Sequence, residues 1–581
     1  MTYAAPLRDM RFVLRHLVAR DPGDDHLDPA LADAILEEAG KFAADILAPL
    51  NVVGDRQGAQ HANGTVTTPD GFKAAYAQFV AGGWNALAGA PEHGGQGLPA
   101  SLATPVEEMW NAANMAFALC PLLTRGAVEA LTLCGTEAQK SRYLPRMIEG
   151  GWTGTMNLTE PQAGSDLSAI RSRAVPQGDH YRIHGQKIFI TYGEHDFTEN
   201  IIHLVLARLP DAPEGVKGIS LFVVPKFLVN DDGSLGARND VRCVSIEHKL
   251  GIHASPTAVL AFGDHAGAYG ELVGEAHRGL EYMFIMMNAA RFAVGLQGVA
   301  IAERAYQQAL SYAQTRVQGT EVGVRNGARV VIIKHPDVKR MLLDMKSRTE
   351  AMRALAYVTA AALDASRRHT DAREAAAQLR RAEFLIPIVK GWCTENAIDI
   401  ASIGVQIHGG MGFIEETGAA QHYRDARILT IYEGTTAIQA NDLIGRKILR
   451  DNGAAALAII NEIHASANAA DSTALHDAAT ELEALVTWVL ETGKINPRAV
   501  AAASVLVLKI FGIITGAWQL ARAGIAAQAA ITAGAADADF CRAKLATTRF
   551  YMAHILPQAA ALAQSARHGT DAILDDAAFA A

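Results

Sequence analysis

Four short segments hold side chains or glycines whose types and spacing could bind a ligand or carry out chemistry. The first is residues 157–166, a stretch rich in Pro and Gly that includes the hydroxyl groups of Thr159 and Ser165. Backbone N–H groups exposed in such a turn, together with the two hydroxyl groups, could hold the polar edge of a ring. Turns of this composition are common, so the segment by itself is more typical of an ordinary loop.

The second segment, residues 187–193, has the alternation of a β-strand. Phe189 and Thr191 lie two positions apart, so they are expected on one face of that strand. An aromatic ring and a hydroxyl group on a common face could contact a planar ligand. Alternating core residues would produce the same pattern, and that simpler interpretation is favoured when the segment is considered alone.

The third feature consists of an arginine and a glycine-rich turn, each at the end of a predicted helix. Arg316 closes one helix, and residues 406–413, with the sequence Gln-Ile-His-Gly-Gly-Met-Gly-Phe, end another. A guanidinium group at a helix end is usually a solvated cap, but it can also grip a diphosphate. Three glycines within four positions let the backbone approach a ligand closely, whereas a helix C-cap explains only one of them.

The fourth segment contains a single carboxylate, Glu433, followed by Gly-Thr-Thr. A carboxylate can act as a general base when its surroundings bring its pKa toward neutrality. Taken alone, however, a glutamate in this context is normally an exposed loop residue.

Other nucleotide or hydrolase patterns are weak or missing. Residues 95–100 match Gly-x-Gly-x-x-Ala, but no predicted strand precedes them and Pro99 interrupts the expected helix start. The sequence contains neither Gly-x-x-x-x-Gly-Lys-Ser/Thr nor Gly-x-Ser-x-Gly. Phosphate-loop and serine-hydrolase chemistry are therefore not indicated.

The elements that must position these segments follow the order helical, β, helical, helical. Apolar residues recur with helical spacing from about residue 28 to 150, and Asp28 with Pro29 predicts a helix cap and first turn. Short runs of β-branched and aromatic residues, separated by Gly, Pro and Asp, predict a β-domain between about 152 and 270. The predicted strands are residues 181–190, 201–209, 218–224, 241–246 and 257–262.

Helical patterns return after Gly279 and continue to the end of the chain. Long helices are predicted at residues 282–316, 336–368 and 373–403, and an Ala-rich helical block follows Gly453. No β-α-β alternation occurs, so a parallel nucleotide-binding sheet is not expected. The predicted domains are an N-terminal extension (1–30), a helical domain (31–155), a β-domain (156–275), a second helical domain (276–450) and an additional helical domain (451–581).

Composition limits the class of protein. The 581 residues are 50% hydrophobic and predict two to four domains, and the formal charge of −9 gives no electrostatic reason to expect nucleic-acid or anionic-lipid binding. Five scattered cysteines without a Cys-x-x-Cys pair favour reduced thiols and no metal site. No signal peptide is recognised, and the apolar stretch 500–535 is interrupted by Lys509, Gln519 and Arg522. A cytoplasmic protein without a membrane span is expected.

In their order and spacing, the four segments together resemble the acyl-CoA dehydrogenase family over about residues 30–450. The motifs are Thr-Glu-Pro with Gly-Ser-Asp, Phe-Ile-Thr, Gln-x-His-Gly-Gly and Ile-Tyr-Glu-Gly-Thr. Each motif is weak alone, but the four in this order are very specific. The resemblance implies a mainly α fold: an N-terminal helical domain, a central β-barrel-like domain and a C-terminal four-helix bundle. It also implies FAD, bound between the domains and across a subunit interface.

The resemblance also implies the role of each site residue. Glu433 would remove the α-proton of an acyl-CoA thioester, and the β-hydrogen would leave as hydride to the flavin. Some family members carry the base on an earlier helix, at the position of Ala290 here, so Glu433 has no rival. The flavin ring would contact Leu158, Thr159, Phe189 and Thr191, with Thr435 touching the cofactor beside the base. Arg316, Gln406, His408, Gly409 and Gly410 would hold the pyrophosphate and adenosine from the partner subunit. Ser165, Asn288 and Arg291 would line the acyl-CoA channel.

The chain departs from the common form of the family in two ways. Tyr192 stands where Asn is usual, and a long segment follows Arg450. Both features resemble a long bacterial branch that includes 3-(methylthio)propanoyl-CoA dehydrogenases and broad-range fatty acyl-CoA dehydrogenases. In that branch the extra helical domain covers the tetramer surface, so a homodimer is expected.

The expected reaction makes a trans-2-enoyl-CoA and passes its electrons to an electron-transfer flavoprotein. Two alternatives have the same fold. One is an acyl-CoA oxidase that uses O2. The other is a non-catalytic acyl-CoA-binding scaffold, which is disfavoured because a buried, unused carboxylate costs stability.

Overall fold

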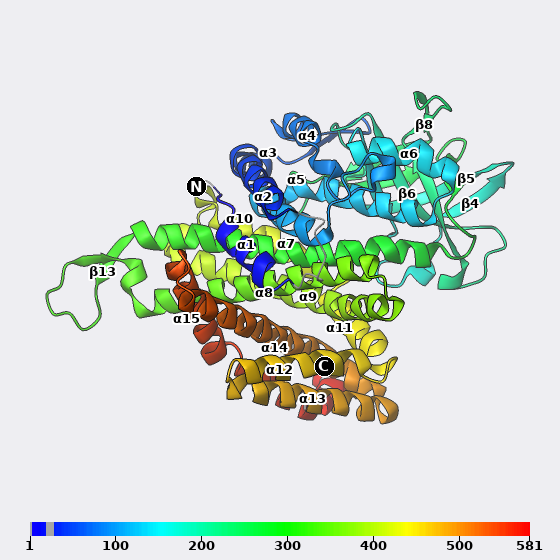
Figure 1. Ribbon diagram of the computed structural model, residues 1–581. Coiled ribbons are helices and arrows are strands. Elements are labelled where there is room, and N and C mark those ends of the chain that lie inside the picture. Colours follow the sequence, from blue (N-terminus) through cyan, green and yellow to red (C-terminus); the bar gives the residue numbers. More distant parts are fainter. Residues whose placement is uncertain (1–2, 19–27, 581) are drawn as a thin grey trace.

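The structure is a computed structural model that describes residues 3–18 and 28–580. Figure 1 shows three layers: the N-terminal helices with the β-domain, the long helices α7, α8 and α9 across the middle, and the C-terminal helices α12 to α15 on the opposite side. The mainly helical fold with a central β-domain and an extra C-terminal helical part agrees with the sequence prediction.

The N-terminal layer is helical, as predicted. Its helices are α1 (Leu7–His16), α2 (Pro29–Phe42), α3 (Ala48–Gln57), α4 (Phe72–Ala81), α5 (Ala100–Cys134) and α6 (Glu137–Glu149). The predicted cap of α2 is confirmed, because Oδ1 of Asp28 accepts the Ala30 N–H at 2.9 Å and Pro29 occupies the first turn. Of the predicted extension 1–30, α1 packs on the body through buried Met10 and Phe12, while residues 1–2 and 19–27 lie outside the described part.

The β-domain is built on an eight-stranded sheet with the order β10-β11-β5-β12-β7-β6-β3, in which β4 also pairs with β5 and β6. All five predicted strands are present, as β5 (His180–Thr191), β6 (Asn200–Arg208), β7 (Ile219–Pro225), β10 (Val241–Ile246) and β11 (Thr257–Phe262). Neighbouring strands run antiparallel except where β6 pairs in parallel with β3 and β4.

Three strands of this sheet were not predicted, namely β3 (Trp152–Asn157), β4 (Arg173–Gln177) and β12 (Ala268–Leu272). Strand β3 is buried on both faces and therefore shows no alternation, and it pairs in parallel with β6. Pro176 in β4 and Gly270 in β12 are residues that weaken a strand signal. Outside this sheet, short hairpins pair β1 (Gln60–Ala62) with β2 (Thr65–Thr67) and β8 (Phe227–Val229) with β9 (Leu235–Arg238).

The central helical layer confirms the three long helices predicted after Gly279. They are α7 (Gly279–Thr315), α8 (Pro336–Arg368) and α9 (Ala372–His408), followed by the short helices α10 (Ala419–Ala426) and α11 (Thr436–Asp442). Helices α7 and α9 approach closely at Gly298, where a Cβ atom would lie 2.6 Å from the Cys393 carbonyl oxygen. A hairpin of β13 (Val317–Thr320) and β14 (Arg329–Val331) joins α7 to α8 and projects from the body in Figure 1.

The C-terminal layer packs against the central layer through the long apolar helix α14 and through α15, whose Lys544 pairs with Glu350 on α8. Its main helices are α12 (Ala454–Ala469), α13 (Thr473–Ile495), α14 (Pro497–Thr532), α15 (Ala538–His554) and α16 (Gln558–His568). Helix α14 packs on α9 so closely that a Cβ atom on Gly512 would lie 2.1 Å from Cγ of Trp392. The C-terminal layer is therefore an integral part of the core of the molecule.

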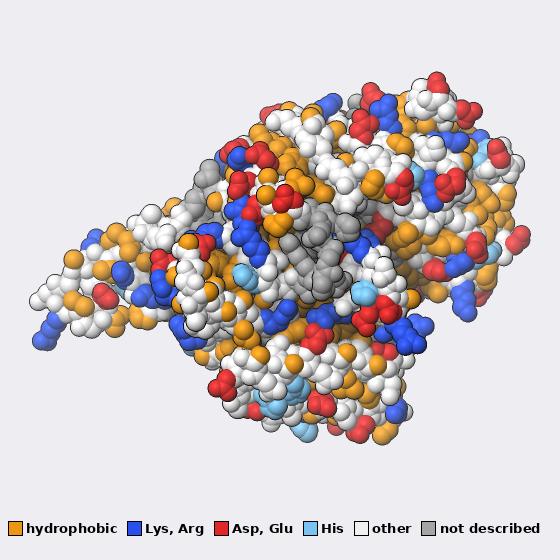
Figure 2. Space-filling model, viewed as in Figure 1, with side chains coloured by type: hydrophobic (Ala, Val, Ile, Leu, Met, Phe, Trp, Pro, Cys, Tyr) orange, Lys and Arg blue, Asp and Glu red, His pale blue; other side chains and the backbone are white. Residues whose placement is uncertain are grey.

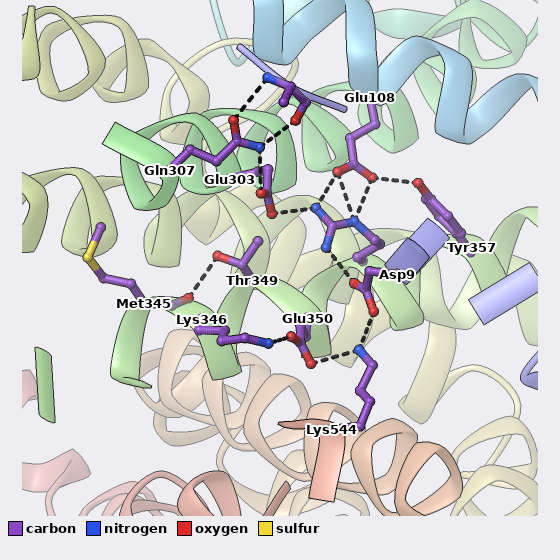
Figure 3. Close-up of polar contacts among 12 residues, drawn as sticks. Asp9, Glu108, Glu303, Gln307, Met345, Lys346, Thr349, Glu350, Tyr357 and Lys544 are labelled. Atoms are coloured by element: carbon purple, nitrogen blue, oxygen red, sulfur yellow. Dashed lines mark hydrogen bonds and ion pairs between the residues drawn. The ribbon is translucent and has the colours of Figure 1, made fainter. Parts of the chain in front are cut away.

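A buried cluster of charges links all three layers (Figure 3). Its centre is Arg353 on α8, which donates hydrogen bonds to Asp9 on α1 (2.6 Å), to Glu108 on α5 (2.6 Å) and to Glu303 on α7 (2.7 Å). Lys544 on α15 also pairs with Asp9, so that the two ends of the chain meet in the same cluster. Burial of this many charges is tolerated only because each has partners.

Three of the described helices, α5, α7 and α14, are long and apolar enough to cross a membrane by length and composition alone. The three interruptions in residues 500–535 therefore do not exclude a span, contrary to the sequence interpretation. In α7 and α14, 72% of the apolar window is buried inside the protein, and in α5 56%. On the face shown in Figure 2, acidic and basic side chains are interspersed and no broad patch of one sign stands out.

Candidate active site

Glu433 lies in the turn that precedes α11 and has an unusual backbone conformation. Its φ angle is 55°, and Gly434 follows with φ 87°. A non-glycine residue in the left-handed region costs about 1–2 kcal/mol, so the surrounding contacts must hold it there. Two side chains do so: Lys390 on α9 donates to the Gly434 carbonyl at 2.6 Å, and Gln439 on α11 donates to the Glu433 carbonyl at 3.1 Å.

The residue before Glu433 is anchored to the helices behind the turn. The Tyr432 hydroxyl donates to Oε1 of Gln297 on α7. The Gln297 amide in turn donates to Oδ1 of Asn111 on α5 at 3.1 Å. Gln297 and Asn111 are both buried, so this chain of hydrogen bonds connects the turn to two helices of different layers.

The Glu433 carboxylate is half-buried, and none of the described residues donates a hydrogen bond to it. Burial raises its pKa to about 7, and the positive charges of Arg291 and Lys390 act in the opposite direction. A carboxylate with a pKa near neutrality and free lone pairs is suited to accept a proton at physiological pH.

Helix α7 supplies the predicted channel residues Asn288 and Arg291, one helical turn apart. Asn288 is exposed, whereas Arg291 is only 4% exposed, with Nη1 lying 3.6 Å from Oδ2 of Asp442. The Arg291 Nε is buried and has no hydrogen-bond partner among the described residues. Between them lies buried Ala290, so this position carries no second carboxylate. The third predicted channel residue, Ser165, is an exposed loop residue.

The predicted ring-contacting residues Leu158 and Thr159 lie in a loop that is fastened to β5. Lys187 of β5 is fully buried and donates to the Leu158 carbonyl at 3.0 Å and to Oε1 of Glu160 at 2.8 Å. The N–H group of Ile188 donates to the Thr159 carbonyl at 2.9 Å. Burial lowers the pKa of Lys187 to about 8, while Glu160 acts in the opposite direction.

Phe189 and Thr191 extend from the same strand at an irregularity of the sheet. Phe189 has a φ of 60°, and the register of β5 against β11 shifts opposite it, between Ala258 and Leu260. The Phe189 ring is 57% exposed and Thr191 is half-buried, whereas Ile190 between them is buried. An exposed ring held in a strained conformation is suited to contact a ligand.

Tyr192 is not part of this exposed surface. It is almost fully buried, and its hydroxyl donates to the Ala116 carbonyl at 2.7 Å. Tyr192, which stands where Asn is usual, thus links the end of β5 to α5 through this hydrogen bond.

The predicted nucleotide-binding residues gather where α7 and α9 end. The ring of Tyr312, one turn before Arg316, stacks on the His408 ring with centroids 4.5 Å apart. Arg316 and Gln406 are exposed. Nδ1 of His408 lies 2.7 Å from the Gly404 carbonyl, and its Nε2 is buried without a partner among the described residues.

Gly409 and Gly410 are exposed next to His408, and Cβ atoms placed on them would meet nothing within 4 Å. Gly409 also has a φ of 61°, which disfavours other residues. An open glycine backbone, an exposed guanidinium group and an unpaired ring nitrogen fit the phosphate-bearing nucleotide of FAD, and the Phe189 surface fits its ring.

Thr435 is the N-cap residue directly before α11, and its hydroxyl accepts the Ile438 N–H at 3.4 Å. It therefore stabilises the helix start directly after the Glu433 turn. A cavity of about 660 Å³ lies elsewhere, between α2 and residues 82–98, and none of the predicted site residues lines it.

Several residues that shape the site were not singled out from the sequence. They are Asn111, Glu160, Lys187, Gln297, Tyr312, Lys390 and Gln439. For Lys390 a signal existed, because it is the one charged residue in the stretch 384–394. A lone charge in a buried helix is usually paired or functional. Glu160 and Lys187 fall inside two of the segments discussed above but were given no role there, and the other residues are ordinary polar residues in helices, where the sequence offers no comparable sign.

Comparison with known proteins gives matches along the whole chain. The family models for the acyl-CoA dehydrogenase N-terminal, middle and C-terminal domains match residues 31–151, 155–265 and 277–449. A model described as acetyl-CoA dehydrogenase C-terminal like matches residues 456–576.

Similar proteins of comparable length are known in bacteria. The chain is 52% identical to 3-methylmercaptopropionyl-CoA dehydrogenase of Ruegeria pomeroyi, over 97% of each chain. It is 35% identical to a broad-specificity linear acyl-CoA dehydrogenase of Mycobacterium tuberculosis, over 99% of this chain and 100% of that one. An acyl-CoA dehydrogenase from Bacillus anthracis, solved with FAD, has the same fold, with a TM-score of 0.75 at 20% identity over 95% of this chain and 90% of that one.

Proposed function

Because the chain belongs to the acyl-CoA dehydrogenase family, whose enzymes use FAD to form a double bond between the α- and β-carbons of an acyl-CoA thioester, we propose that Glu433 is its catalytic base. The observation that carries this assignment is the carboxylate itself: half-buried, without a hydrogen-bond donor among the described residues, and with a pKa of about 7. Addition of acyl-CoA thioesters to the purified protein under anaerobic conditions should bleach the yellow flavin absorbance.

The chemistry requires a base inside a site that excludes water. The α-C–H of a thioester is a very weak acid, and a carboxylate close to the carbon can remove the proton only if it is poised near neutrality. The turn that carries Glu433 has a left-handed backbone, and its carbonyl groups accept hydrogen bonds from Lys390 and Gln439. When bound, FAD supplies the acceptor for the hydride that leaves the β-carbon.

We infer that FAD is held by two groups of residues. Leu158, Thr159, Phe189, Thr191 and Thr435 would contact the ring, and Arg316, Gln406, His408, Gly409 and Gly410 would contact the pyrophosphate and adenosine. Ser165, Asn288 and Arg291 would line the acyl-CoA channel. Exposure of the Phe189 ring and the unpaired nitrogens of His408 and Arg291 support these roles.

A homodimer would bring the two groups of FAD residues together. Lys390, beside the base, and His408, at the nucleotide end, are 18 residues apart on α9, which is roughly 27 Å at 1.5 Å per residue. The projecting hairpin after Arg316 exposes Val322 and Val324, which are 75% and 50% exposed. Burial of these side chains against a second copy would explain their exposure in one chain. Light scattering after size exclusion should give the mass of two chains.

The proposed substrate is 3-(methylthio)propanoyl-CoA, because the relative with 52% identity is named for this thioester. A short- to long-chain fatty acyl-CoA is the second candidate, supported by the relative that is named a broad-specificity linear acyl-CoA dehydrogenase. Pentanoyl-CoA is the matched control, since it has CH2 in place of sulfur and the same number of heavy atoms in the acyl group. A kcat/KM for the thioether at least equal to that for pentanoyl-CoA would support the sulfur-containing substrate, whereas a strong preference for pentanoyl-CoA would contradict it.

The proposed electron acceptor is an electron-transfer flavoprotein and the proposed compartment is the cytoplasm. Oxygen uptake during turnover without another acceptor would instead identify an oxidase. Acyl-CoA binding without any bleaching would identify a non-catalytic scaffold. Recovery of the protein in the membrane fraction after lysis would contradict the cytoplasmic assignment and the expectation that none of the three apolar helices spans a bilayer.

A further inference from the structure

Lys390 is a fully buried ammonium group directly beneath the turn that carries Glu433. It lies on α9, and its Nζ donates a hydrogen bond to the Gly434 carbonyl at 2.6 Å. Gly434 is the residue after Glu433, so the contact acts on the peptide unit next to the base. The two residues are far apart in the sequence and meet only because α9 and the turn pack together.

The charges around Lys390 show what its ammonium group can act on. Glu433 and Glu395 are the acidic groups that favour its charged form, and Arg291 opposes it. Glu395 accepts a hydrogen bond from the Thr436 hydroxyl at 2.5 Å. No carboxylate of the described residues lies within 4.0 Å of Nζ of Lys390.

Arg291, the other cation near Glu433, is in a different position. It has its own carboxylate, Asp442, at 3.6 Å, and Asp442 also pairs with Arg446 at 3.3 Å. Arg291 therefore has a close carboxylate, which it shares with Arg446, whereas none of the described residues places a carboxylate within 4.0 Å of Nζ of Lys390. Burying an ammonium group without such a partner is costly, and burial lowers its pKa to about 8. The ammonium charge therefore acts mainly on the nearby acidic groups, Glu433 and Glu395.

We propose that Lys390 is a positioning residue for the reaction: its hydrogen bond to Gly434 fixes the direction of the Glu433 carboxylate, and its charge favours the ionised form of that carboxylate. The proposal rests on the role of Glu433 as the base. Lys390 would act on the reaction through the turn and through the electric field at the base.

The turn is also held by Gln439, which donates hydrogen bonds but carries no charge. Comparing Gln439 with Lys390 therefore separates the effect of a hydrogen bond to the turn from the effect of a positive charge near Glu433. Gln439 donates to the Glu433 carbonyl at 3.1 Å and to the Gly434 carbonyl at 3.3 Å. Replacing Gln439 by Leu removes a hydrogen-bond donor but leaves the charges at the site unchanged. Replacing Lys390 by Met, which is similar in length, removes both the donor and the charge. Gln439→Leu is therefore the matched control for Lys390→Met.

The test is the pH dependence of flavin bleaching in the full-length, FAD-loaded protein, measured by stopped flow with a saturating acyl-CoA thioester. The rate of bleaching should rise with pH as Glu433 loses its proton. For Lys390→Met, loss of the cation should shift this rising limb of the pH–rate curve to higher pH by about 1 unit, because an opposite charge nearby lowers a carboxyl pKa by about 1–3 units. The rate at pH 7 should fall and recover at high pH. Lys390→Arg should leave the pH of the rising limb unchanged. Gln439→Leu should lower the rate of bleaching without shifting the limb.

The outcomes distinguish this proposal from the assignment of the base. If Glu433→Gln still bleaches its flavin at the wild-type rate, the base assignment fails. If Glu433→Gln is inactive but Lys390→Met has an unshifted limb, the base stands and the role of Lys390 is overturned. Should Lys390→Met fail to fold, Lys390→Gln, which keeps a neutral donor, provides the same comparison with the charge removed.

Discussion

Arg353 on α8 and Glu108 on α5 form a bidentate ion pair in the interior of the protein, with Nη2 2.6 Å from Oε1 and Nε 3.2 Å from Oε2 of the carboxylate. One helical turn along α5 from Glu108, Asn111 accepts the hydrogen bond from Gln297 on α7. Gln297 also accepts the Tyr432 hydroxyl, next to Glu433. Arg353 also donates to Glu303 on α7 at 2.7 Å, so α5 and α7 are linked twice, through the ionic contacts of Arg353 and through the neutral contact of Gln297 with Asn111.

Replacing Arg353 by Met should destabilise the protein strongly. The substitution leaves Asp9, Glu108 and Glu303 buried without their central cation, and removing one partner of a buried pair typically costs about 3–5 kcal/mol. Thermal unfolding followed by circular dichroism should show a clearly lower Tm. Lys41→Met is the control, since Lys41 forms an exposed pair with Glu38 and its loss should leave the Tm nearly unchanged. Equal Tm values for the two variants would show that the cluster does not stabilise the fold.

Truncation after Arg450 should give an aggregating or higher-order protein and not a smaller active dimer. The cut removes α14, which buries Trp392 on α9, and so exposes an apolar face of the central layer. It also removes Lys544, leaving Asp9 and Glu350 without that cation. Size exclusion with light scattering measures the outcome. A monodisperse, active dimer of the truncated chain would show that the C-terminal layer is independent.

Replacing Glu433 by Gln should abolish the reaction while preserving the protein. Glutamine keeps the side-chain volume but cannot accept the α-proton, and a positioned base contributes roughly 10²–10⁴ in rate. The loss should reach at least the upper end of that range. FAD content and acyl-CoA binding should survive, so the expected product is a yellow protein that binds its ligand but no longer bleaches. Loss of FAD in this variant would instead indicate a structural role for Glu433.

The wild-type enzyme should gain activity as the pH rises through about 7. Burial raises the pKa of Glu433 to about 7, and only the ionised carboxylate can take the α-proton, so kcat/KM should increase with pH below that value and level off above it. Substrate oxidation rates between pH 5 and 9 at constant ionic strength provide the check. A rising limb near pH 4.5, the ordinary range of a glutamic acid, would mean that burial does not perturb Glu433.

Replacing Arg316 by Met should weaken FAD binding. A charge-assisted hydrogen bond contributes about 1.5–3 kcal/mol, so the Kd should rise about 10- to 100-fold. Arg498→Met is the control, because Arg498 is also exposed but lies in the first turn of α14, away from the hairpin that is proposed to face a second copy. Fluorescence titration of the apoprotein with FAD measures both variants. Equal FAD affinities of the two variants would show that Arg316 does not bind the nucleotide.

The sequence determined the long helices, five of the strands and the family of this protein. Helical spacing, β-branched runs and the cap at Asp28 are local signals, because they reflect interactions between residues a few positions apart. The strands β3, β4 and β12 were missed for the same reason: burial on both faces, Pro176 and Gly270 erase the local pattern.

Only the tertiary structure decided what surrounds the base. Glu433 belongs to a recognisable motif, but its left-handed backbone, its pKa of about 7 and its neighbours Lys390 and Arg291 result from the packing of α7 and α9 on one turn. The same holds for Tyr312 on His408 and for Lys187 under Leu158. These contacts join residues distant in the chain, and burial and electric fields depend on everything that packs around a group, which no local pattern of residues contains.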